Sequence, residues 1–181
     1  MKIRFCGVGG QGIVKAAYIF GNAAVIDGYN VVQTRTYGSA YRGMLSKSDV
    51  IISKKPIYEL EFLYPDILVC FSQKGYKTYK GGIHPEGLLF IDSDLVQLDI
   101  MHSHIYKLNA SVLSYERFGS KLFGNMIMLG YLTAIVELIS KEAMEESISQ
   151  KTPGGTEEEN LEAFEIGYNI GLKEKSGFLK V

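Results

Sequence analysis

The chain has 181 residues, of which 46% are hydrophobic and 22% charged, with a net charge of −1. This length fits one domain over residues 1–181 with a core of ordinary size. The charge balance excludes the basic surface of a nucleic-acid-binding protein. The longest apolar stretch, residues 126–135, is too short to cross a bilayer, and no signal peptide is visible. We therefore expect a cytoplasmic protein with no membrane or nucleic-acid partner.

A glycine-rich turn follows the first apolar run of the chain, Ile3-Arg4-Phe5-Cys6. A strand that ends in glycines and leads into a helix brings bare backbone N–H groups, and the positive end of the helix, up to an anion. Glycine turns also serve packing alone, and that alternative stays open. The candidates for an anion-binding turn are Gly7, Gly9, Gly10, Gln11 and Gly12.

Apolar spacing after the turn predicts a helix to about residue 27 and a second strand over residues 29–34. A strand–helix–strand unit implies a mainly parallel sheet. Further expected elements are strands over 48–53, 67–71, 87–92 and 105–108, a short helix between Pro56 and Pro65, a helix over 73–79, and helices from Ser111 onward, with Ser140 and Thr156 opening the last two. The pattern predicts a three-layer α/β/α, Rossmann-like domain with a helical C-terminal third.

A polar loop after the second strand carries three further candidates, Tyr37, Gly38 and Arg42. In a parallel sheet this loop leaves from the same edge as the glycine turn. Arginine offers a bidentate fork for a phosphate or for a partner's carboxylate. The alternative is an arginine that only faces solvent.

Nicotinamide binding is disfavoured by the residue at the end of the second strand. A dinucleotide site needs an acidic residue there to hold the ribose hydroxyls, and the chain has Gln33, followed by Thr34 and Arg35. Arg35 could meet a 2′-phosphate, so a stand-alone NADP-type oxidoreductase or regulatory module is kept as an alternative function.

Metal and cluster binding are also disfavoured by the residues present. The two cysteines, Cys6 and Cys70, lie in apolar runs and are too few for a four-cysteine site. They are interpreted as buried, reduced thiols. The three histidines, His84, His102 and His104, are interpreted as surface residues. No metal ligand set and no catalytic set is expected on this chain.

Several ordered segments together resemble the gamma subunit of the 2-oxoacid:ferredoxin oxidoreductases, the group that acts on pyruvate, 2-oxoglutarate, branched-chain oxoacids or indolepyruvate. The segments that carry this resemblance are residues 7–13, 28–34, 37–38, 42–43, 46–53, 65–69, 72–73, 125–130 and 159–164.

The resemblance implies a subunit of a complex that converts a 2-oxoacid and coenzyme A into acyl-CoA and CO₂, with electrons passing through iron–sulfur clusters to ferredoxin. It implies that alpha, beta and optionally delta subunits hold the thiamine diphosphate, Mg and clusters, and that this chain holds no cofactor and is inactive alone. Gly9, Gly10, Gln11, Gly12 and Arg42 would then face coenzyme A phosphates or a subunit interface.

The loop departs from the family's Tyr-Gly-Pro-Glu-Ala-Arg-Gly-Gly pattern. Ser39, Ala40 and Tyr41 replace Pro-Glu-Ala, and Met44 replaces the second glycine. This departure leaves open whether the loop keeps the family's polar partner and substrate class. Two further alternatives stay open: a purely structural role for the chain, and a homodimer of the isolated chain through tyrosine- and methionine-rich faces.

Overall fold

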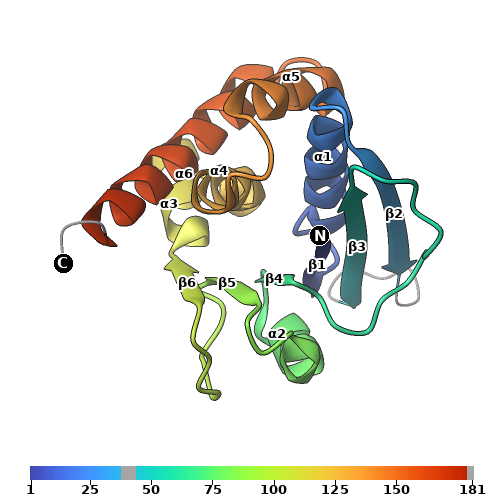
Figure 1. The fold of residues 1–181 in the computed structure, drawn as a ribbon. Helices are drawn as coiled ribbons and strands as arrows, with labels where there is room; N and C mark the ends of the chain where they lie inside the picture. The colour runs from blue at the N-terminus through green and yellow to red at the C-terminus, as the bar shows by residue number, and fades with distance from the viewer. Residues whose placement is uncertain (38–43, 179–181) are drawn as a thin grey trace.

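The computed structural model describes residues 1–37 and 44–178, and its strands form a single sheet (Figure 1). The strands are β1 (Lys2–Val8), β2 (Asn30–Tyr37), β3 (Leu45–Ser53), β4 (Ile67–Cys70), β5 (Leu88–Asp92) and β6 (Ile105–Leu108). Their order across the sheet is β2-β3-β1-β4-β5-β6. The expected mainly parallel sheet is confirmed, because the strands other than β3 share one direction.

Strand β3 is the antiparallel member and lies between β1 and β2. The two strands of the predicted strand–helix–strand unit are therefore parallel but not neighbours. The physical reason is the short connection between β2 and β3, from residue 37 to residue 45. A parallel return needs a crossover of a dozen or more residues, so the chain turns back beside β2 instead.

Helices cover both faces of the sheet, which confirms the three-layer expectation. The helices are α1 (Ile13–Ile26), α2 (Gln73–Tyr79), α3 (Ala110–Phe118), α4 (Gly124–Val136), α5 (Lys141–Lys151) and α6 (Glu157–Phe178), with 3₁₀ turns η1 (Lys80–Gly82) and η2 (Lys121–Phe123). Helices α1 and α4 share the larger core with one face of the sheet, with α5 and α6 outside them (Figure 1). Helix α2 covers a smaller core on the other face.

Helix α4 is the centre of the larger core. Its residues from Gly124 to Ala134 are all buried, as expected from its apolar sequence on every side. It packs against α6 through a reciprocal glycine contact. A Cβ atom on Gly130 would overlap the Phe164 carbonyl of α6, and one on Gly167 would overlap the Ile127 carbonyl of α4. The two backbones can therefore approach only because both positions lack a side chain.

The prediction of a short helix between Pro56 and Pro65 is wrong. Residues 54–66, which connect β3 to β4, contain neither helix nor strand and are named the connector below. In the part of the chain that the structure describes, no helix is long and apolar enough to cross a bilayer.

Candidate functional site

The glycine turn lies at the carboxyl end of β1, beside the end of β4. Gln11 braces the two: its Oε1 accepts the Val8 N–H at 2.8 Å, and its Nε2 donates to the Phe71 carbonyl at 2.5 Å. One side chain thus satisfies backbone groups at two strand ends, where the ladder hydrogen bonds stop. This fixes the turn to the sheet.

Different structural features explain why glycine occupies each position of the turn. Gly10 and Gly12 have φ angles of 99° and 71°, in the region where side chains are strained. A side chain on Gly12 would also strike the Asn125 amide of α4. At Gly7, a Cβ atom would lie 2.6 Å from both Gln11 Oε1 and Ile13 Cδ1. Packing alone therefore explains Gly7, whereas the open space around Gly10 leaves its backbone accessible.

Some backbone N–H groups of the turn donate hydrogen bonds within the protein, whereas the first N–H groups of helix α1 have no side-chain cap. The Val8 N–H is bound by Gln11, and the Gly9 N–H donates to the Met44 carbonyl at 2.9 Å. Gly12 directly precedes the first residue of helix α1, Ile13, and no side chain caps the first N–H groups of the helix. Because the first turn of a helix has no internal acceptors and carries the positive end of the dipole, this end of α1 suits an anion.

A pocket of about 290 Å³ opens beside the turn, at the carboxyl ends of β1, β4 and β5. In open α/β sheets, ligands bind in this kind of crevice, where the strand order reverses. The lining residues are Gly10, Gln11, Phe71, Asp92, Leu95, Ser111, Lys121, Leu122, Gly124 and Asn125. The turn therefore forms part of the wall of a concavity that Lys121 also lines.

Asp92 is a pocket residue that the sequence analysis did not single out. Its carboxylate is buried and accepts the Ser111 N–H at 3.1 Å and the Ser111 hydroxyl at 2.6 Å, at the first turn of α3. Burial raises the pKa of Asp92, while these hydrogen bonds oppose the rise. An acidic residue directly after the apolar run of β5 was the signal that could have found it.

The second-strand loop leaves from the same edge as the glycine turn, as expected. Ser46 of β3 pairs with Gly7 on one side and with Tyr37 on the other, so the three backbones form one row. Gly38 and Arg42 lie outside the described residues. Tyr37 is thus next to the turn by its backbone position.

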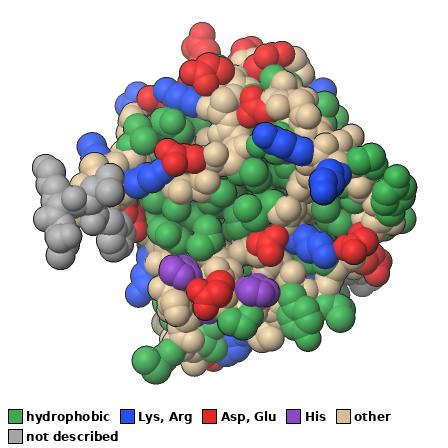
Figure 2. All heavy atoms as spheres, in the orientation of Figure 1, with side chains coloured by type: hydrophobic (Ala, Val, Ile, Leu, Met, Phe, Trp, Pro, Cys, Tyr) green, Lys and Arg blue, Asp and Glu red, His purple; other side chains and the backbone are tan. Residues whose placement is uncertain are grey.

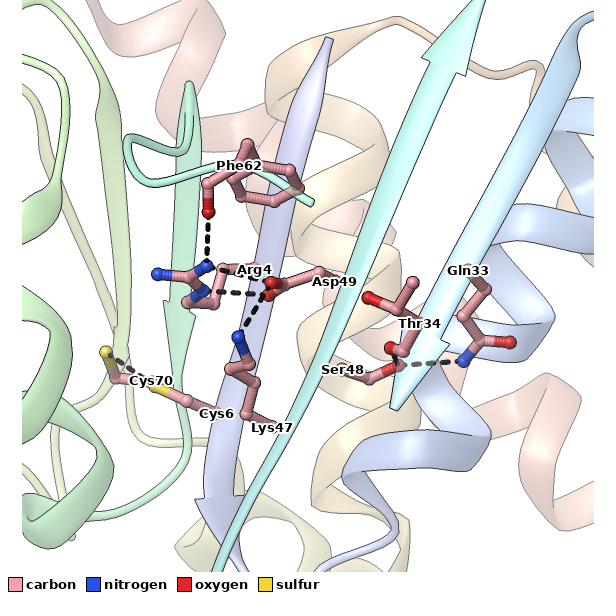
Figure 3. Close-up of polar contacts among 9 residues, drawn as sticks. All are labelled: Arg4, Cys6, Gln33, Thr34, Lys47, Ser48, Asp49, Phe62 and Cys70. Atoms are coloured by element: carbon pink, nitrogen blue, oxygen red, sulfur yellow. Dashed lines mark hydrogen bonds and ion pairs between the residues drawn. The ribbon is translucent and has the colours of Figure 1, made fainter. Parts of the chain in front are cut away.

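Gln33 occupies the place of the missing ribose-binding acid and points inward. Its Nε2 donates to the Ser48 hydroxyl at 2.8 Å (Figure 3). The same nitrogen donates to the Val14 carbonyl of α1 at 3.2 Å. A side chain used in this way between β2 and α1 does not hold a ribose. The geometry therefore agrees with the sequence argument against a dinucleotide site.

Cys6 and Cys70 are fully buried neighbours on β1 and β4, with their Sγ atoms 3.4 Å apart (Figure 3). Burial raises the pKa of the Cys70 thiol, so the neutral form is favoured. The interpretation as buried thiols is confirmed. His102 is half-exposed, with its Nε2 2.6 Å from the Gly87 carbonyl, so this surface histidine also contacts the backbone.

Comparisons with known proteins agree on one family. The family model described as pyruvate ferredoxin/flavodoxin oxidoreductase matches residues 2–170. The chain is 43% identical to the 2-oxoglutarate synthase subunit KorC of Methanocaldococcus jannaschii, over 93% of this chain and 92% of the relative. It is 27% identical to the pyruvate synthase subunit PorC of Methanothermobacter marburgensis, over 93% and 96%.

A solved structure shares the fold over nearly the whole chain. It is the gamma subunit of a keto/oxoacid ferredoxin oxidoreductase from Geobacter sulfurreducens, with 32% identity and a TM-score of 0.83. The match covers 95% of this chain and 98% of the solved one. Fold and sequence therefore point to the same kind of subunit.

Proposed function

This chain belongs to the pyruvate ferredoxin/flavodoxin oxidoreductase family, as a gamma-type subunit of a 2-oxoacid:ferredoxin oxidoreductase, and from that membership we propose what it contributes to the complex. Residues 1–181 act as one gamma-type domain, in line with the family match over residues 2–170. The oxoacid is 2-oxoglutarate. The observation behind this choice is 43% identity to a 2-oxoglutarate synthase subunit against 27% to a pyruvate synthase subunit.

In this proposal the chain carries no redox cofactor and does not turn over substrate alone. The whole sequence has two cysteines, and both face each other in the core rather than a site. An iron–sulfur cluster needs about four ligands. Thiamine diphosphate, Mg and the clusters therefore belong to the alpha, beta and optional delta subunits, and ferredoxin meets the complex there. Two adjacent free thiols also suit a reducing cytoplasm.

The part of this chain in the reaction is to hold coenzyme A at the glycine turn. What supports this is the pocket: Gly10 and Gln11 form one wall, Lys121 lines it, and the uncapped start of α1 lies at the same turn. These are groups that attract phosphate. A volume of about 290 Å³ fits one portion of coenzyme A, with the remainder along the surface towards Tyr37.

The test is steady-state kinetics of the co-expressed complex with a Lys121→Gln variant. Loss of one phosphate-facing charge, worth about 1 kcal/mol, is expected to raise the KM for coenzyme A about fivefold. The kcat and the KM for the oxoacid should not change. Lys74→Gln, an exposed lysine on α2, is the matched control and should change nothing.

Two results would contradict the proposal. A KM for coenzyme A that is the same in Lys121→Gln and Lys74→Gln removes the pocket from coenzyme A binding. A purified single chain that is coloured, or that reduces an acceptor without other subunits, removes the assignment of the cofactors to partners. A panel of oxoacids with the complete complex tests the choice of 2-oxoglutarate separately.

A further inference from the structure

The two cysteines of the chain lie directly opposite each other on neighbouring strands. Cys6 of β1 and Cys70 of β4 are partners in the parallel register, and their Sγ atoms lie 3.4 Å apart (Figure 3). Neighbouring strands are about 4.8 Å apart, which is within the Cα separation of about 4.4–6.8 Å that a disulfide spans. A bond between the two sulfurs therefore needs only small movements of the strand ends.

Helix α2 covers the two sulfurs. Both cysteines are fully buried and belong to the smaller core, together with Tyr76 of α2. The helix lies close to β1, since a Cβ atom added to Gly75 would be 3.1 Å from the Sγ atom of Cys6. A solute therefore reaches the thiols only when α2 moves away from the sheet.

Helix α2 is held to the protein by contacts that favour such local opening. It has seven residues, and a helix of this length has little stability of its own. The Tyr76 hydroxyl donates to Asp99 Oδ1 at 2.8 Å and accepts the Asp99 N–H at 3.1 Å. Gln73 exchanges two exposed hydrogen bonds with the backbone of Gln97. Exposed hydrogen bonds over a small core are typical of segments that open without global unfolding.

We infer that Cys6 and Cys70 are an oxidation site, which forms a reversible disulfide between β1 and β4 when a peroxide reaches the opened core. One thiolate attacks a peroxide oxygen and becomes a sulfenic acid, and the hydroxide that leaves takes up the first thiol proton as water. The second sulfur displaces the sulfenic hydroxyl, which leaves with the second thiol proton as another water. The peroxide receives the two electrons that the two thiols lose.

The short distance between the sulfurs determines which oxidation product forms. A sulfenic acid with no thiol nearby is oxidised further to a sulfinic acid, which dithiothreitol does not reduce. Here each cysteine has the other 3.4 Å away, so each can resolve the sulfenic acid of the other. The disulfide would join the two strands one residue before Gly7 and Phe71, at the base of the glycine turn. The inference requires neither partner subunits nor coenzyme A.

The test treats the folded full-length chain with hydrogen peroxide, unfolds it with an alkylating reagent present, and counts the labels by mass spectrometry. We expect two labels before treatment, none afterwards, and two again after dithiothreitol. The whole sequence has two cysteines, so an unlabelled monomer on a non-reducing gel contains the internal disulfide. Apolar side chains also reach the surface (Figure 2), and the exposed ones include Met44 and Met101. Peptide mapping therefore separates methionine oxidation from cysteine oxidation.

Two variants test the resolving role and the opening of α2. In Cys70→Ala, Cys6 has no resolving partner, and we expect it as a sulfinic acid that dithiothreitol does not reverse. Tyr76→Phe keeps the ring in the core but loses the hydroxyl contacts with Asp99, so disulfide formation should be about fivefold faster. The matched control is Tyr115→Phe, at an exposed tyrosine of α3, which should react at the rate of the unchanged chain.

Four results would overturn the inference. The first is a chain that still takes two labels once its exposed methionines are oxidised. The second is a disulfide between two copies in place of the internal one. The third is sulfinic acid at either cysteine of the unchanged chain. The fourth is equal rates of disulfide formation in Tyr76→Phe and Tyr115→Phe, which would remove α2 from the control of access.

Discussion

Replacement of Gly130 by alanine should destabilise the chain, although alanine is the better helix former. Alanine favours a helix over glycine by about 1 kcal/mol. Against this, the new Cβ atom would overlap the Phe164 carbonyl and crowd the Tyr168 N–H of α6. Backbone atoms cannot rotate away, so α4 and α6 must separate, and overpacking of this kind costs about 3 kcal/mol. We expect a net loss of about 2 kcal/mol.

For a chain of this size, such a loss lowers the melting temperature by roughly 4–8 °C. Thermal unfolding followed by circular dichroism measures it. Gly177→Ala is the matched control: this glycine is also within a helix, α6, and nothing lies within 4 Å of its added Cβ atom. The double variant Gly130→Ala/Gly167→Ala should lose less than the two single losses together, because one separation of the helices relieves both overlaps. A Gly130→Ala melting temperature equal to that of Gly177→Ala would refute the reasoning.

Gln11→Glu keeps an acceptor for the Val8 N–H but loses the donor to the Phe71 carbonyl after β4. Urea unfolding should therefore show that the free energy of unfolding falls by about 1–3 kcal/mol. An unchanged midpoint would argue against the role of Gln11 in joining the two strand ends. Arg4→Met leaves the buried Asp49 with Lys47 as its remaining cation, and we expect a loss of about 3 kcal/mol that Arg4→Met/Asp49→Leu largely recovers. Burial raises the pKa of Asp92 above its ordinary 3.8, so the folded chain holds this proton to higher pH than the unfolded chain. The free energy of unfolding should therefore fall as pH rises through that window, and Asp92→Asn should remove this slope, while identical pH profiles of the two proteins would count against it.

Local signals were sufficient for much of the fold. The helix over residues 73–79 and the strand over residues 105–108 have the predicted bounds. Ser140 caps the next helix as expected, since its hydroxyl accepts the Ala143 N–H at 3.2 Å. These features depend on apolar spacing and on capping chemistry within a few residues, which a sequence displays directly.

The errors lie where distant residues decide the structure. The connector has prolines at both ends of an apolar stretch, which suggested a short helix, but Arg4 binds the Phe62 carbonyl from 58 residues away. That contact, rather than local propensity, sets the path of the connector. In the same way, Asp92 becomes a pocket residue only because α3 places Ser111 against it. The spacing of residues along the sequence does not show which distant residues will contact each other in the fold.

The Gln11 brace has a consequence for how the turn can respond to a ligand. Since one amide joins the end of β1 to the carbonyl after β4, the turn cannot shift without pulling on two central strands. For the anion proposed above, the spacing of the backbone donors would already be set by the sheet before binding. At this wall of the pocket, selectivity then depends on the size and shape of the ligand. Any change of conformation on binding has to occur in the ligand, because the turn is fixed to the sheet.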